Sequence, residues 1–217
     1  MRFRRSTVLR IMRRTLAPLA LAVALAAAPA VAGDVSVDVR DQAGKPVRDA
    51  VVMIRPAGGV APGTPMKVNW PMVMAQQNTQ FTPYVLIVPL GSTVSFPNKD
   101  KVRHHVYSFS APKKFELKLY GRDETRSITF DKPGAVSLGC NIHDSMIAFI
   151  FVSDTPFAAK SNPQGVAVVQ DAPAGGATLL VWHPDLKARA PIARPLAVAG
   201  AAQRATVTVE LRPALTR

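Results

Sequence analysis

Short apolar runs in which hydrophobic and polar positions alternate follow one another along most of the chain. The first is "VSVDVR" at residues 35–40, and runs of four to eight β-branched or aromatic residues between Pro, Gly, Asn or Asp are typical of strands. Others are "AVVMIR" (50–55), "HHVYSFS" (104–110), "FELKLY" (115–120), "RSITF" (126–130), "AVSLGC" (135–140), "IAFIFVSD" (147–154) and "ATVTVEL" (205–211). No segment beyond residue 32 has a helical period, so the pattern predicts an all-β protein.

Turn residues divide these runs into pairs. The segment "DQAGKP" (41–46) predicts a hairpin-like pairing of the first two strands, and Gly91 divides residues 85–98 into two more. The chain between residue 56 and Tyr84 is rich in proline and glycine and is expected to be mostly loop. Residues 165–182 supply two strands around "APAGG", and the short, regular spacing is that of a β-sandwich.

The first 32 residues have the pattern of a signal peptide. A basic start with six arginines precedes the apolar run "LAPLALAVALAAA", and "AVA" at residues 30–32 is a cleavage signal. We expect cleavage after Ala32, by the general secretory or the twin-arginine route, and a periplasmic mature protein. A retained signal anchor is the alternative. No later apolar run has membrane-spanning length, so no span is expected in the mature chain.

Removal of this leader would lower the net charge of the protein. The whole chain of 217 residues has a formal net charge of +13, and without residues 1–32 it keeps 21 basic against 14 acidic residues, a net charge of +7. The basic residues are scattered among the strands without a dense run or an aromatic platform. We therefore expect no nucleic-acid binding, and attraction to an acidic partner protein.

The only cysteine of the chain lies in "CNIHDSM", residues 140–146. A lone cysteine in an oxidising compartment makes no internal disulfide, so Cys140 is either a buried inert residue or a metal ligand. Cys140, His143 and Met146 supply a thiolate, an imidazole and a thioether at short spacing between two predicted strands. This donor set suits copper, and "HH" at residues 104 and 105 offers the second imidazole of a blue-copper site.

These segments resemble the cupredoxins. "GSTVSFPNKDKVRHHVYSF" is similar to the plastocyanin and amicyanin segment that leads to the first copper histidine, and "CNIHDSM" has the Cys-x2-His-x2-Met spacing of amicyanin. The block that joins them also looks like the plastocyanin-like proteins labelled methylamine-utilisation proteins. The resemblance covers about residues 67–154 and implies a Greek-key β-sandwich with one type I copper per chain.

The resemblance implies a role for individual residues. Cys140, His143 and Met146 match the clustered ligands, and His104 matches the distal ligand because it follows Phe96 by eight residues. His105 replaces an asparagine of the family, so it is a candidate for supporting the ligands or for replacing His104. Asn98, in the loop before the histidines, is a candidate for the same supporting or alternative role. Ile142 and Ile147 are expected to surround the exposed edge of His143 where a redox partner binds.

The two ends of the mature chain show a second, weaker resemblance. "VSVDVRDQAGKPVRDAVVMIRPAG" and "GVAVVQDAPAGGATLLVWHP" are similar to the halves of the prealbumin-like repeat attached to carboxypeptidases. We therefore expect a small flanking β-sandwich from residues 33–60 and 156–213 beside the copper domain at 67–154. A cupredoxin with long terminal strands is the alternative.

A site closed by four protein ligands favours one-electron transfer over substrate binding. The histidines outside the ligand set, His183 and one of His104 and His105, are too few for a catalytic copper centre. We expect a periplasmic one-electron carrier that is not an enzyme. The alternatives are a copper-delivery or copper-resistance protein, and a β-sandwich binding module without redox activity.

Overall fold

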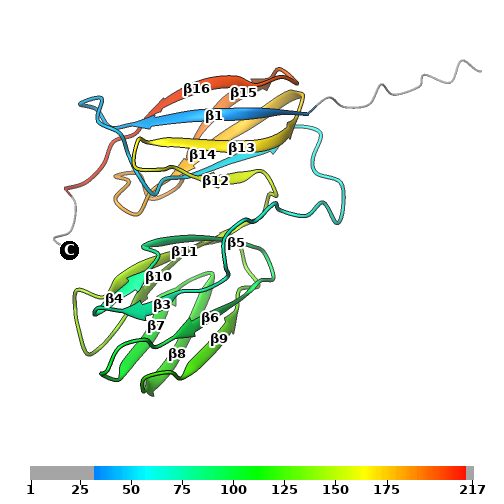
Figure 1. Ribbon diagram of the computed structural model, residues 1–217. Helices are drawn as coiled ribbons and strands as arrows, with labels where there is room; N and C mark the ends of the chain where they lie inside the picture. Colours follow the sequence, from blue (N-terminus) through cyan, green and yellow to red (C-terminus); the bar gives the residue numbers. More distant parts are fainter. Residues whose placement is uncertain (1–31, 214–217) are drawn as a thin grey trace, which may run out of the picture.

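The structure, a computed structural model, describes residues 32–213, and these residues form strands joined by turns and loops (Figure 1). They contain no helix, and in particular none long and apolar enough to cross a membrane. The predicted class, an all-β cupredoxin-like sandwich with a small flanking sandwich, is confirmed. The predicted signal peptide lies outside the described residues, except for Ala32, which begins the first strand.

Figure 1 shows two groups of strands, and in the sequence the second group is inserted between two parts of the first. The first group comes from both ends of the chain: β1 (Ala32–Arg40), β2 (Val51–Pro56), β12 (Ala158–Lys160), β13 (Val166–Pro173), β14 (Gly175–Trp182), β15 (Ile192–Val198) and β16 (Gln203–Thr208). The second is continuous: β3 (Ala75–Gln77), β4 (Gln80–Thr82), β5 (Val85–Pro89), β6 (Thr93–Pro97), β7 (His104–Ser110), β8 (Lys113–Tyr120), β9 (Thr125–Thr129), β10 (Gly134–Gly139) and β11 (Ile147–Ser153).

The first group forms a sandwich of two sheets, with strand orders β13-β1-β16 and β12-β2-β14-β15. Strand β1 is antiparallel to β13 and parallel to β16, so the beginning and the end of the described chain lie in one sheet. Val35, Val37 and Val39 are fully buried while the residues between them are more exposed, as expected for a strand with one face on a core. They pack against Val52 and Ile54 of the other sheet.

The expected hairpin between residues 35–40 and 50–55 is wrong. Strand β1 pairs with β13 and β16, whereas β2 pairs with β12 and β14 in the opposite sheet. The two strands differ in what covers them: β1 buries alternate residues, but the first four residues of β2 are all buried. Strand β2 has apolar contacts on both of its faces, so it lies between the sandwich core and a second apolar layer.

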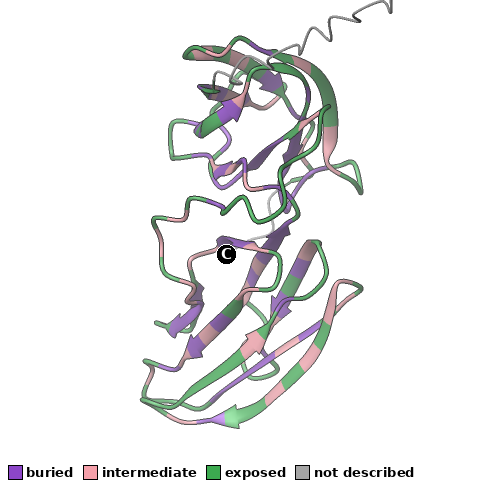
Figure 2. Cartoon of the chain, turned by 90° about the vertical axis from the view of Figure 1, so that its right-hand side faces the viewer, coloured by how far each residue is buried: buried purple, intermediate pink, exposed green. Residues whose placement is uncertain are grey.

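The second group forms a five-stranded sheet of order β5-β11-β10-β7-β8, opposed by the pairs β6–β9 and β3–β4. Its core contains the following buried residues: Met74, Phe81, Leu86, Val88, Val94, Phe96, Val106, Tyr120, Phe130, Val136, Leu138, Cys140, Met146, Ala148, Ile150 and Val152. Figure 2 shows buried, intermediate and exposed positions interspersed along these strands. Strands β3, β4, β12 and β15 were missed by the sequence pattern, because three of them have only three residues and β15 is largely exposed.

A shared apolar cluster joins the two sandwiches. Val51 and Met53 of β2 and Trp182 of β14 contact the outer face of the five-stranded sheet, where the Trp182 ring lies 5.1 Å from the ring of Phe151 and 5.9 Å from that of Phe149. This cluster is the second layer that covers β2.

Side chains also cover the open edge of β5 beside this cluster. The indole N–H of Trp70 donates to the carbonyl of Ile87 at 2.8 Å, and the ammonium of Lys160 donates to the carbonyl of Val85 at 2.8 Å. Because an unpaired strand edge can add a strand from another chain, these two bonds protect the edge.

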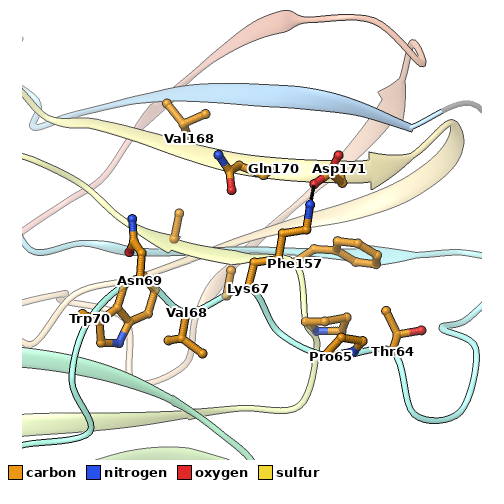
Figure 3. A pocket seen from close by; sticks show the side chains of 13 residues that line it. Thr64, Pro65, Lys67, Val68, Asn69, Trp70, Phe157, Val168, Gln170 and Asp171 are labelled. Carbon is orange, nitrogen blue, oxygen red and sulfur yellow. Dashed lines mark hydrogen bonds and ion pairs between the residues drawn. The ribbon is translucent and has the colours of Figure 1, made fainter.

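The loop between β2 and β3 crosses the side of the flanking sandwich. A cavity of about 520 Å³ lies between residues 64–70 of this loop and strands β12 and β13, and Figure 3 shows the side chains that line it. Lys67 forms an ion pair with Asp171 of β13 across the cavity, which ties the loop to the flanking sandwich. The strand grouping is compatible with the expected domain boundaries, which stay a prediction.

The apolar cluster generates a prediction about stability. Trp182→Ala should lower the free energy of unfolding by about 3–5 kcal/mol, because it removes a large buried side chain between two sandwiches. It should also separate the unfolding of the two sandwiches into two transitions in a denaturant titration. Phe109→Ala is the matched control, since Phe109 is 79% exposed, and it should cost less than about 1 kcal/mol. Equal losses for the two variants would contradict a stabilising role for the cluster.

Candidate metal centre

The candidate ligands are held at the ends of strands in the five-stranded sheet. His104 is the first residue of β7, Cys140 directly follows β10, and Met146 directly precedes β11. The intervening loop is closed by a turn in which the backbone N–H of Met146 donates to the carbonyl of His143 at 2.9 Å. Neighbouring strands therefore fix the two ends of this loop, and the core of the sandwich fixes Cys140 and Met146, which are 3% and 1% exposed.

His104, Cys140 and His143 lie in one cluster. One nitrogen of each imidazole and the thiol sulfur all lie within 4.8 Å of one another. The Nδ1 atom of His104 is 3.9 Å from Cys140 Sγ, and the two histidine rings have centroids 5.4 Å apart. The backbone N–H of Ile142 donates to the same sulfur, at 3.5 Å.

The hydrogen bonding of these groups fits a metal ion. His143 Nδ1 is buried and has no hydrogen-bond partner among the described residues, which is costly for a polar atom. His104 uses Nε2 to contact the carboxylate of Asp100 at 2.7 Å, so its Nδ1 is left facing the sulfur. A cation between the two imidazoles and the thiolate would satisfy all three atoms. The cluster can thus hold a metal that accepts nitrogen and sulfur ligands.

Met146 is buried in the same apolar core as Cys140. Both residues also line a surface groove of about 390 Å³, which continues past Asp144 and Tyr107. The Tyr107 ring lies directly over Gly139, where a β-carbon would come within 2.6 Å of Tyr107 Cζ. A side chain at residue 139, immediately before the cysteine, would therefore require the Tyr107 ring to move.

His105 points to another partner. Its Nε2 contacts a carboxylate oxygen of Glu116 at 2.9 Å, and its ring lies 5.6 Å from that of Tyr107. It therefore takes part in contacts with β8 and not in the cluster with Cys140. Of the two adjacent histidines, His104 is the one that the fold brings to the sulfur, because alternate residues of a strand face opposite sides.

Asn98 holds the loop that precedes His104. Its side-chain amide donates to the carbonyls of Val102 and Tyr120, and its carbonyl oxygen accepts the N–H of Asp100 at 2.9 Å. It is completely buried, and one of its partners, Asp100, contacts His104. The expectation that Asn98 supports the ligands stays a prediction, for which this network is the structural basis.

Asp100 was missed in the sequence because a carboxylate in a loop gives no signal of its own. Burial by itself would raise the pKa of Asp100, but the N–H of Thr79, the imidazole of His104 and the N–H of Asn78 together lower it. The residue is therefore a carboxylate at neutral pH. The only available hint was its position four residues before His104.

Tyr120 supports the same region from β8, where it pairs with His104. Its hydroxyl donates to the carbonyl of Phe96 at 2.8 Å and also contacts the amide of Gln76. Burial raises the pKa of Tyr120 to about 12, so this hydroxyl stays protonated.

Ile142 and Ile147, which were expected to surround His143, differ in exposure: Ile142 is 48% exposed, whereas Ile147 is half-buried.

Several solved copper-protein structures are similar to part of this chain. A copper-containing nitrite reductase from Thermus scotoductus SA-01 is 31% identical with a TM-score of 0.38, and the match covers 44% of this chain and 25% of that one. A reduced Cu(I) form of an amicyanin mutant at pH 4 is 21% identical with a TM-score of 0.36, and the oxidised state of another amicyanin mutant is 22% identical with a TM-score of 0.35. Each amicyanin match covers 48% of this chain and 99% of the amicyanin. No family model and no curated protein sequence matches the chain.

The first of these matches corrects one expectation. The sequence was expected to encode a protein that is not an enzyme, but the matched nitrite reductase is an enzyme. We therefore withdraw that expectation. The reductase activity itself is not assigned to this chain, because the chain spans only 25% of that protein.

The cluster geometry predicts that the two adjacent histidines differ in metal binding. His104→Ala should weaken Cu(II) binding strongly because it removes an imidazole nitrogen 3.9 Å from the thiol sulfur, whereas His105→Ala should keep a Cu(II) affinity within a few-fold of the parent. Competition titration with a chelator measures both affinities. Strong loss in His105→Ala with little loss in His104→Ala would place the ligand at residue 105.

Proposed function

We propose that this protein is a type I copper protein of the periplasm that carries single electrons, with one copper per chain. The observation that supports this proposal is the cluster of one buried thiol and two imidazoles with ligand atoms within 4.8 Å of one another. Met146 supplies a thioether from the same loop as Cys140 and His143. One thiolate, two imidazoles and a weak axial thioether are the donors of a blue-copper site.

The donor set favours copper over zinc. Structural zinc is normally held by four cysteine or histidine ligands, and the cluster in the described residues contains three such groups. A thioether is a poor ligand for zinc and a good one for Cu(I). Met146 therefore discriminates between the two metals, because it replaces the fourth cysteine or histidine.

The bound copper would supply a one-electron couple. The chain contributes a site that changes little between the two oxidation states, because Cys140 and Met146 are embedded in the sandwich core and His104 is held by Asp100. Rigid strand ends around a closed site are suited to fast electron transfer, since few atoms have to move.

Apolar side chains surround this end of the sandwich and offer a docking surface. Ile142 is next to His143 and is 48% exposed, while Val102, two residues before His104, is 46% exposed. Leu119 is 42% exposed, and its carbonyl accepts a hydrogen bond from the Arg103 guanidinium at 3.1 Å. We infer that a redox partner contacts Ile142 and the neighbouring edge of His143.

The charge beside this apolar surface selects the partner. Lys99, Lys101 and Arg103 are all exposed in the loop that leads to His104. Positive charge at the rim of a docking surface speeds association with a partner of opposite charge and has a smaller effect on the final affinity. The proposed partner is therefore an acidic redox protein.

The proposal predicts an intense visible absorption band when the mature protein binds Cu(II), from charge transfer between the Cys140 thiolate and the metal. Cys140→Ser should abolish this band, because a hydroxyl does not replace the thiolate. Ser145→Ala, in the same loop, should retain it and serves as the control. Absorption spectroscopy and metal analysis at one equivalent of copper measure the result. An intense band in Cys140→Ser would contradict the ligand assignment.

An electron carrier must also keep its copper in both oxidation states. Voltammetry of the copper-loaded protein should give a reversible one-electron couple, with no copper transferred to a Cu(I) chelator during repeated cycles. Electron exchange with an acidic redox protein should slow as salt is added, because salt screens the charges of the loop at residues 99–103. Ready loss of copper on reduction would favour copper delivery over electron transfer.

A further inference from the structure

Asp100 lies between the candidate metal centre and a strained turn. Its carboxylate oxygen Oδ2 contacts Nε2 of His104 at 2.7 Å, and the side chains of Asp100 and His104 are 13% and 0% exposed. The N–H of Asn78 donates to Oδ1 at 2.7 Å and the N–H of Thr79 donates to Oδ2 at 2.9 Å. Two backbone donors and one imidazole thus converge on a single carboxylate.

The turn that provides the two backbone donors has an unfavourable conformation. Asn78 and Thr79 connect β3 to β4 with φ angles of 56° and 54°, in the left-handed region. Asparagine tolerates this region, but a β-branched threonine is rarely found there. Strain of this kind persists where the surrounding structure requires it, and here it directs both N–H groups at Asp100.

We propose that Asp100 is a positioning residue that holds His104 with its Nδ1 towards the metal and biases a bound copper towards its oxidised form. This inference rests on the proposed function. A carboxylate that accepts a hydrogen bond from the remote nitrogen of a ligating imidazole fixes the tautomer and makes the imidazole a stronger donor. A stronger donor with a nearby negative charge stabilises Cu(II) more than Cu(I), so the reduction potential is lowered.

The position of the carboxylate is fixed independently of the metal. The N–H of Asp100 donates to the side chain of Asn98, which is itself bonded to the carbonyls of Val102 and Tyr120. The carboxylate is therefore anchored through its backbone on one side and by the turn at residues 78–79 on the other. His104 has little freedom to rotate away from it, because its ring is fully buried.

Asp100→Asn tests the charge, because it has nearly the same shape and keeps one oxygen acceptor. The variant should raise the reduction potential and weaken Cu(II) binding by about 10–100-fold, with a smaller loss for Cu(I). Asp144→Asn is the matched control, because Asp144 adjoins His143 and carries the same charge but is exposed. The reduction potential of the Asp144→Asn variant should shift much less than that of Asp100→Asn. Asp100→Ser, which also removes the charge, should reproduce the direction if Asp100→Asn folds poorly.

A measurement on the metal-free protein separates this inference from the copper function. Nitrogen NMR of the histidine side chains should find the proton of His104 on Nε2 in the parent and a mixture of tautomers in Asp100→Ser. Equal potential shifts in Asp100→Asn and Asp144→Asn, or an unchanged tautomer in Asp100→Ser, would overturn the positioning role. If the parent lacks the thiolate-to-copper band, the proposed function fails, while the tautomer measurement still decides the role of Asp100.

Discussion

The core of the sandwich formed by β3–β11 and the candidate metal centre share side chains. Cys140 and Met146 belong to the buried cluster that joins the five-stranded sheet to the strands opposite it. A ligand loop that is also part of a close-packed core has little freedom, because cores tolerate few changes in side-chain position. The relative positions of the two sulfur atoms are therefore set by the same packing that stabilises the fold.

The distal histidine depends on a different kind of interaction. His104 starts β7, and its orientation is set by a carboxylate and by a loop that Asn98 organises through hydrogen bonds. A buried polar network of this kind is effective only if each group has a partner. The apolar core thus positions the thiolate side of the site, and the polar network positions the opposite imidazole.

The flanking sandwich packs against the sandwich formed by β3–β11 and holds it in place. Residues 57–157 leave the flanking sandwich after β2 and return to it at β12, and β2 and β12 are paired strands. Because both connections start from adjacent strands, the inserted sandwich is held at one place, and the apolar cluster around Trp182 fixes it there. The flanking sandwich lies against the outer faces of β5 and β11, whereas the ligands come from the strand ends at β7 and from the loop between β10 and β11. The surface at Ile142 stays exposed as a result.

The sequence by itself determined the elements and the chemical groups. Alternation of apolar residues predicted most strands, and the spacing of Cys140, His143 and Met146 predicted one loop with three donors, because both patterns depend on neighbours along the chain. It did not decide which strands pair. The expected hairpin of β1 and β2 was wrong because the two strands, although joined by turn residues, lie in opposite sheets across one core. Only the tertiary structure brought His104 to within 3.9 Å of Cys140 and turned His105 towards Glu116. Only the tertiary structure showed that the Asp100 carboxylate contacts His104 and accepts the N–H groups of Asn78 and Thr79. The contacts with Asn78 and Thr79 join distant segments, so they follow from packing and not from local pattern.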